Sequence, residues 1–173
     1  MENFFKSIER QAFRLALFAC HNRDDALDLV QDSMCKFVDK YSQKPESEWK
    51  ALFYKILQNK IRDFYRREAI RSRWRVWFGK NSEETVGDAL EQLADPRNKN
   101  PEQETEEKFK FSQLQTELEK LSLKQQQVFL LRAWEGLSVK ETAQAMKCSE
   151  GTVKTHYFRA TEQLKKNLGD QWL

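Results

Sequence analysis

The sequence predicts an all-α protein made of two small helical domains that are joined by an extended acidic linker. Three observations lead to this fold class. The 173 residues include only five glycines and three prolines, and Leu, Lys, Glu, Gln, Arg and Ala, which dominate, are good helix formers. Apolar residues recur at helical spacing in residues 1–78 and again in residues 105–173. Residues 79–104 are instead rich in Gly, Pro, Asn, Asp and Glu and lack that spacing, which is typical of a solvated linker.

The first domain, residues 1–78, is expected to contain three main helices. The first covers about Phe4 to Cys20. Residues from Asn22 to Asp25 supply a cap and first-turn acids for a second helix that runs to about Tyr41. Pro45 breaks the chain, and Ser47 can cap a third helix that continues into a basic run. In the second helix the positions predicted to be buried are Ala26, Leu29, Val30, Phe37 and Val38.

The second domain, residues 105–173, carries strong signals for helix ends. An apolar stripe resumes with Phe111 and Leu114. The residues from Ser122 to Gln125 and from Ser138 to Glu141 form two capping boxes, each the start of a helix. Gly136 is suited to end the first of these helices. The second is expected to span Val139 to Met146, and after a short turn and a cap at Ser149 a last helix runs to about Leu168.

Charge is distributed unevenly along the chain, although the net charge is only +3. Residues 55–75 hold eight basic and two acidic residues, a net charge of +6. Residues 81–107 hold nine acidic and two basic residues, a net charge of −7. A basic surface and an acidic connector are therefore separate features.

Domains of about 70 residues are only marginally stable alone, so each should gain from docking on something else.

Several functional classes are disfavoured by the same sequence. Cys20, Cys35 and Cys148 have neither the number nor the spacing of a disulfide framework or zinc site, and Cys20 beside His21 fits helix packing better than a metal site. No apolar run is long enough for a membrane span, and the first ten residues do not resemble a signal peptide, so we expect a cytoplasmic protein. No catalytic motif is present, and neither enzymatic activity nor a cofactor is expected.

Two segments suggest nucleic-acid binding. The pattern of helix, tight turn and helix from Glu135 to Ala160 is typical of a helix-turn-helix, whose second helix enters the major groove. The alternative, that its polar residues are only the solvated face of an amphipathic helix, is less favoured because two consecutive capping boxes frame the helices. In the basic run, cations alternate with Tyr54, Phe64, Tyr65, Trp74 and Trp77, which is typical of surfaces that hold single strands. For Trp49 and Phe64 we favour a place in the core.

At this point the chain resembles a known family, the extracytoplasmic-function (ECF, group IV) sigma factors of bacterial RNA polymerase, within the sigma-70 family. The segment RDDALDLVQDSMCKFV, residues 23–38, resembles the region 2 helix that docks on the β′ clamp of core polymerase. The resemblance implies polymerase-binding residues at Asp28, Gln31, Asp32 and Lys36. The segment WKALFYKILQNKIRDFYRRE, residues 49–68, resembles the part that recognises and melts the minus-10 element. It implies contacts to that DNA from Asn59, Lys60, Arg62, Asp63, Arg66 and Arg67.

Residues 118–164 resemble region 4, which reads the minus-35 element. The resemblance implies contacts to this duplex from Arg132, Lys154, Thr155, His156, Phe158 and Arg159. It also implies the β flap of the polymerase as a second docking site, promoter DNA in duplex and single-stranded form, and an anti-sigma factor as a further partner. One departure concerns the turn, where Lys147 stands at a position usually held by glycine.

Two other functions remain open on the residues alone. A stand-alone helix-turn-helix regulator would share the segment SEGTVKTH, residues 149–156, but would carry a ligand-binding or phospho-acceptor α/β domain upstream. A helical adaptor without a nucleic-acid role is disfavoured by the basic run. We therefore expect a sigma factor that binds core polymerase, recognises both promoter elements and initiates transcription of a specific set of genes.

Overall fold

The computed structural model describes residues 1–78 and 112–169. Within those ranges all regular elements are helices and there is no strand, which confirms the all-α prediction. The predicted acidic linker, residues 79–104, lies outside the described residues, as do the predicted start of the second domain at residue 105 and the apolar position Phe111.

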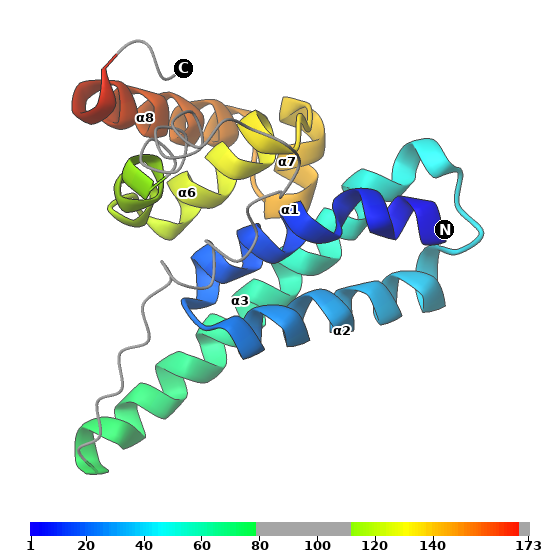
Figure 1. The fold of residues 1–173 in the computed structure, drawn as a ribbon, viewed down its shortest axis with the longest axis horizontal. Coiled ribbons are helices and arrows are strands. Elements are labelled where there is room, and N and C mark those ends of the chain that lie inside the picture. Colours follow the sequence, from blue (N-terminus) through cyan, green and yellow to red (C-terminus); the bar gives the residue numbers. More distant parts are fainter. Residues whose placement is uncertain (79–111, 170–173) are drawn as a thin grey trace, which may run out of the picture.

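The first half of the chain forms three helices, α1 (Glu2–Cys20), α2 (Arg23–Tyr41) and α3 (Glu46–Phe78), which pack side by side (Figure 1). Helix α1 ends where His21 takes a left-handed conformation with φ of 55°. The Asn22 side chain then accepts a hydrogen bond from the backbone N–H of Asp25, at 2.9 Å, and caps α2 as predicted. An aromatic cluster fills the space between the three helices, with members Phe4, Phe5, Phe37, Trp49 and Phe53.

The second half forms α6 (Leu123–Phe129), a π-helical turn η1 (Leu130–Trp134), α7 (Val139–Met146) and α8 (Glu150–Leu168). Both predicted capping boxes are present, at Ser122 and at Ser138. The Ser149 side chain accepts from the Thr152 backbone N–H at 3.1 Å and caps α8. Gly136, with φ of 63°, closes the turn after η1, which agrees with its predicted role as a helix end.

The two halves share one hydrophobic core, and Figure 1 shows the helices of the second half lying beside those of the first. Helices α6 and α7 of the second half lie against α1 and α3 of the first. Phe18 of α1 is fully buried, and its ring centroid lies 5.8 Å from that of Trp134 in η1. Leu118, Leu130 and Leu131 join the same cluster. The docking expected of small domains is therefore realised between the two halves of this chain.

One buried position in α2 was predicted wrongly. Val38 is 41% exposed, whereas Ser33 is fully buried. The buried face of α2 follows helical spacing through Ala26, Leu29, Ser33 and Phe37, and Val38 lies about 100° further around the helix than Phe37. Ser33 is tolerated there because its hydroxyl donates to the Leu29 carbonyl at 2.6 Å.

No helix in the described part of the chain is both long and apolar enough to cross a membrane. The three cysteines are free. Among residues 1–78 and 112–169 there is no cluster of three or more His, Cys, Asp or Glu side chains that could hold a metal ion.

Candidate nucleic-acid and partner interfaces

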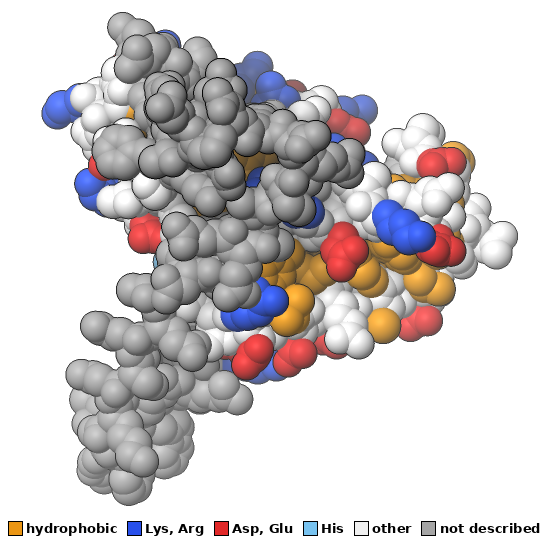
Figure 2. Space-filling view, in the orientation of Figure 1, with side chains coloured by type: hydrophobic (Ala, Val, Ile, Leu, Met, Phe, Trp, Pro, Cys, Tyr) orange, Lys and Arg blue, Asp and Glu red, His pale blue; other side chains and the backbone are white. Residues whose placement is uncertain are grey.

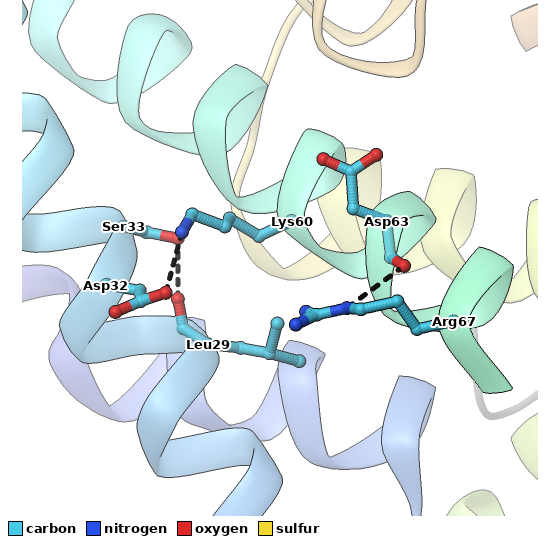
Figure 3. A network of polar contacts seen from close by, with 6 residues as sticks. All are labelled: Leu29, Asp32, Ser33, Lys60, Asp63 and Arg67. Atoms are coloured by element: carbon cyan, nitrogen blue, oxygen red, sulfur yellow. Dashed lines mark hydrogen bonds and ion pairs between the residues drawn. The ribbon is translucent and has the colours of Figure 1, made fainter. Parts of the chain in front are cut away.

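The outer face of α2 presents the four residues predicted to bind a protein partner. Asp28, Gln31, Asp32 and Lys36 are all exposed. The Asp32 carboxylate also accepts a hydrogen bond from Lys60 Nζ of α3 at 2.6 Å (Figure 3). This ion pair ties the predicted partner-binding helix to the predicted minus-10 helix.

Helix α3 positions the predicted minus-10 residues on one side of the bundle. Asn59, Lys60 and Arg62 are half-buried, whereas Asp63, Arg66 and Arg67 are exposed. The Arg62 guanidinium donates to the Asn59 side-chain oxygen and, at 2.7 Å, to the backbone carbonyl of Met146 at the end of α7. A residue predicted to contact DNA is thus held by the other half of the chain.

On the exposed part of the α3 surface, Arg66 and Arg67 make only weak contacts with Asp63. Arg66 Nη1 lies 3.6 Å from the Asp63 carboxylate, with both side chains well exposed. Arg67 Nε donates to the Asp63 carbonyl at 3.4 Å along the helix (Figure 3). Exposed ion pairs of this kind contribute little to stability. Both guanidinium groups therefore remain accessible to phosphate.

The turn between α7 and α8 has the geometry of a helix-turn-helix. Lys147 adopts a left-handed conformation, with φ of 53° and ψ of 50°. The Cys148 backbone N–H donates to the Ala143 carbonyl at 3.1 Å. Val153 is fully buried and packs with Val128 and Ala143 in a small cluster at the point where the helices meet. A lysine thus occupies a backbone conformation that favours glycine.

Four of the predicted minus-35 residues project from α8 into solvent. Lys154, Thr155, Phe158 and Arg159 are exposed, and Phe158 is 62% exposed. The Thr155 hydroxyl donates to the Gly151 carbonyl at 3.0 Å. A large apolar side chain beside a threonine and two cations provides the group types that contact thymine methyls, base edges and phosphates.

His156 and Arg132, also predicted to face the minus-35 duplex, are less exposed than expected. The His156 side chain lies half-buried toward α3 and α6, where it lines a cavity. Its buried Nδ1 has no hydrogen-bond partner among the described residues. The Arg132 guanidinium donates to the Leu137 carbonyl and lies 5.6 Å from the centroid of the Tyr157 ring. Arg132 therefore supports the position of α8 from within the domain.

A buried glutamine pair joins the two halves. Gln58 of α3 and Gln127 of α6 are 2% and 1% exposed, and Gln58 Nε2 donates to Gln127 Oε1 at 2.8 Å. Gln127 Nε2 also lies 3.4 Å from the Leu15 carbonyl of α1. Buried amides are costly without partners, so these hydrogen bonds define how α6 sits on α1 and α3.

A buried carboxyl group lies at the same interface. Glu135 is 5% exposed, and its carboxylate is 3.5 Å from Lys50 Nζ of α3. Burial raises the pKa of Glu135, and the neighbouring Tyr54 hydroxyl and Lys50 ammonium only partly offset this effect. Burial, followed by the charge of Glu135, also raises the pKa of Tyr54. The carboxyl group is therefore easier to protonate in the folded chain than in water.

Gln58, Gln127 and Glu135 were not among the residues predicted from sequence to be functional. A signal for one of them was present: Gln127 ends a run of three glutamines directly before the apolar residues Val128 and Phe129. A polar side chain inside an apolar stripe indicates a buried polar contact. For Glu135 the sequence holds no such sign, because its burial follows from packing beside Lys50 and Tyr54 of α3, far away in the sequence.

Acidic side chains also mark the first half of the molecule. Figure 2 shows acidic groups along α2, with hydrophobic side chains gathered between α1 and α2 on the same face. Leu27 is 45% exposed beside Asp28. The outer side of α2 thus combines exposed carboxylates with exposed apolar surface.

Two family models match the chain. The model described as Sigma-70 region 2 matches residues 4–71, and the model described as Sigma-70, region 4 matches residues 111–164. The first contains α1, α2 and most of α3, and the second contains α6, α7 and most of α8.

Similar proteins carry related names. The chain is 32% identical over 145 residues to the RNA polymerase sigma-E factor of Streptomyces antibioticus, covering 83% of this chain and 71% of that one. It is 30% identical over 158 residues to the RNA polymerase sigma factor SigV of Bacillus subtilis (strain 168), covering 90% and 83%. Its fold is similar to that of the sigma factor RpoE of Bartonella quintana, solved in complex with the anti-sigma factor NepR. The TM-score is 0.67 at 22% identity, covering 98% of this chain and 99% of that one.

Proposed function

The chain belongs to the extracytoplasmic-function sigma factors of the sigma-70 family, and we propose that each of its three exposed surfaces performs one part of promoter-specific transcription initiation. The observation that carries this assignment is their coexistence in one fold. A polar face on α2, a cationic face on α3 and a recognition face on α8 are all accessible in part. A stand-alone regulator is not favoured, because the segment upstream of the helix-turn-helix matches region 2.

In this proposal residues 1–78 form the region 2 domain. Its α2 face, with Asp28, Gln31, Asp32 and Lys36, binds the β′ clamp of core polymerase. Exposed carboxylates next to exposed Leu27 support this role. The α3 face binds the minus-10 strand through Asn59, Lys60, Arg62, Asp63, Arg66 and Arg67, whose cations neutralise phosphates.

Residues 105–173 form the region 4 domain, which contacts the β flap and reads the minus-35 duplex. Lys154, Thr155, Phe158 and Arg159 make the direct contacts, supported by their exposure on α8. We propose that Arg132 and His156, which are half-buried, also belong to the minus-35 surface. Residues 79–104, which lie outside the described residues, act as the acidic connector between the domains.

The docking of the two halves implies a step before promoter binding. Arg62 donates to the Met146 carbonyl, so it reaches minus-10 DNA only when α7 moves away from α3. The α8 face requires no such movement. We infer that core polymerase binds the form in which the two halves are separated. The free energy needed to separate them then lowers the apparent affinity for promoter DNA.

Partners and location follow from the same assignment. The proposed sigma factor is a non-catalytic subunit that acts with core polymerase in the cytoplasm. The structural relative in complex with an anti-sigma factor supports an anti-sigma factor as a regulatory partner of this chain as well.

The direct test is reconstitution. Purified chain added to core polymerase should give transcripts from specific promoters that core alone does not give. Failure of the chain to co-migrate with core polymerase would contradict the proposal.

A matched pair of variants tests the α2 face. Asp32→Ala should weaken binding to core polymerase, whereas Asp39→Ala, which removes another exposed carboxylate of α2, should not. Lys60→Gln breaks the same ion pair from the other side and keeps Asp32. If Lys60→Gln weakens core binding as much as Asp32→Ala, the carboxylate acts through the ion pair and not through the polymerase.

A further inference from the structure

A cavity of about 640 Å³ lies between the two halves, partly open to solvent. Its walls come from α3 on one side and from α6, the α7–α8 turn and the start of α8 on the other, with one residue from α2. This volume falls within the range of about 300–1,000 Å³ that is usual for small-molecule sites.

The lining of this cavity is strongly cationic. Among the described residues, the basic side chains that line it are Lys36, Arg62, Arg66, Lys124, Lys147 and His156, and the lining carboxylate is that of Asp63. Asp63 already lies 3.6 Å from Arg66. Within the described ranges, no acidic side chain pairs with Lys36, Lys124 or Lys147. Several unpaired cations around one partly enclosed space create a positive potential that attracts an anion.

The pKa of His156 is affected by this positive potential. Burial lowers its pKa, and the positive charges of Lys124 and Arg159 lower it further. For Arg62, burial is likewise the main cause of a lowered pKa, which the charge of Asp63 partly offsets and that of Arg66 lowers further. An anion seated among these groups would counter the effect of the neighbouring cations.

We propose that this cavity binds an oligophosphate ligand of nucleotide size. Phosphate is the chemistry that suits the site, because arginine and lysine side chains converge on it from several helices. Gln58, Asn59 and Thr152 offer neutral hydrogen-bonding groups to the rest of the ligand. This binding site goes beyond the proposed function, since it is a property of the sigma chain without polymerase or promoter.

The placement of the cations gives the ligand a structural effect. Arg62 and Arg66 belong to α3, whereas Lys124 and Lys147 belong to the other half. A ligand that contacts both sets bridges the halves and stabilises their docked arrangement. It also occupies two of the cations assigned to minus-10 DNA.

The test is calorimetric titration of the full chain with inorganic tripolyphosphate, ATP and adenosine. Binding of tripolyphosphate and ATP with similar affinity supports a site for phosphate alone. Binding of ATP but not of tripolyphosphate or adenosine supports a nucleotide site. If neither phosphate compound binds, the proposal is overturned.

Two variants with matched controls assign the binding to the cavity. Lys124→Glu places an acid in the first turn of α6, where helices favour it, and Lys147→Gly suits the left-handed backbone, so neither substitution should prevent folding. Each should weaken ligand binding, and together they should weaken it roughly tenfold or more, equivalent to about 1.4 kcal/mol. Lys140→Glu removes an exposed cation of α7 away from the cavity and should change the affinity less than about twofold. Equal losses in Lys140→Glu and Lys124→Glu would show a general charge effect and would overturn the proposal.

A second readout uses the two histidines of the chain. In NMR titrations the pKa of His156 should rise when tripolyphosphate is present, because the added negative charge favours the protonated ring. The His21 signal serves as the internal reference. A His156 titration that does not respond to saturating ligand would place the bound anion elsewhere and overturn the assignment. Transcription by reconstituted holoenzyme without ligand tests the sigma function separately.

Discussion

The two surfaces proposed to bind DNA, on α3 and on α8, differ in how far their side chains are already engaged within the chain. On α8, Lys154, Phe158 and Arg159 point into solvent. On α3, Arg62 is held by the Met146 carbonyl of α7, and Lys60 by Asp32 of α2. The region 4 surface is preformed, and the region 2 surface is partly occupied by the chain itself. Docking of the halves thus governs one surface and leaves the other free.

Of the substitutions that test this difference between the α3 and α8 surfaces, Gln127→Leu is expected to have the largest effect. The substitution leaves the buried Gln58 amide and the Leu15 carbonyl without their partner, which should lower the free energy of unfolding by about 1–3 kcal/mol. Weaker docking should also release Arg62, so binding of single-stranded minus-10 DNA should become tighter. Urea denaturation and fluorescence anisotropy measure the two quantities.

The control for this variant is Gln144→Leu, which alters an exposed glutamine of α7 and should change neither quantity appreciably. A Gln58→Leu/Gln127→Leu double variant should recover part of the lost stability, because both amides are removed together. A Gln127→Leu protein that is less stable but binds the single strand no better would show that docking does not limit the α3 surface.

Arg159→Ala tests the preformed surface. If Arg159 reads a base, the holoenzyme should lose roughly 1–3 kcal/mol of affinity for its own minus-35 sequence and much less for altered sequences. Competition binding with a set of minus-35 variants measures this discrimination. An equal loss on all sequences would mean that Arg159 contacts phosphate.

Glu135→Gln tests the pH dependence of docking. Burial raises the pKa of Glu135 in the folded chain above its unfolded value. The folded state then binds the proton more readily, so the free energy of unfolding falls as pH rises through the interval between the two pKa values. The variant should therefore gain stability relative to the wild type as pH increases across that interval, in urea titrations at several pH values.

Glu141→Gln is the control, because its effect on the free energy of unfolding should depend on pH with the opposite sign. Hydrogen bonds from Ser138 lower the pKa of Glu141. Its contribution to stability is present above the unfolded pKa and is lost as pH falls through the folded pKa. If both variants show the same pH trend, the burial of Glu135 is not its cause.

The smallest effect is expected from Lys147→Gly. Glycine relieves the left-handed backbone at φ of 53° and should raise the free energy of unfolding by roughly 0.5–1 kcal/mol. Thermal unfolding measures the change. Lys140→Gly, inside α7, should instead destabilise the protein by up to about 1 kcal/mol, and a gain in both variants would contradict the explanation from backbone conformation.

The local features of this fold were predictable from sequence, because they depend on neighbouring residues. The caps at Asn22, Ser138 and Ser149 and the end of α7 at Met146 agree with the prediction. The predicted cap at Ser47 was wrong, because α3 begins at Glu46 and Ser47 lies in its first turn. The fold class and the family resemblance were confirmed too. The roles of the individual site residues remain predictions, although four of those on α8 are exposed as expected.

The packing of the two halves could not be predicted in this way. The contact between Gln58 and Gln127 joins residues 69 positions apart, and no local pattern encodes it. The π-helical turn from Leu130 to Trp134 was also missed, because its residues are ordinary in an α-helix. That turn precedes Glu135, whose burial beside Lys50 follows from tertiary packing.

The acceptor of the Arg62 hydrogen bond determines which substitutions can break this contact. The acceptor is a main-chain oxygen at the carboxyl end of α7, where the helix dipole also favours a cation. Every amino acid supplies that oxygen, so substitutions at Met146 that keep the backbone path leave the hydrogen bond intact. Substitution of Arg62 should therefore remove this restraint, whereas most substitutions of Met146 should leave it in place.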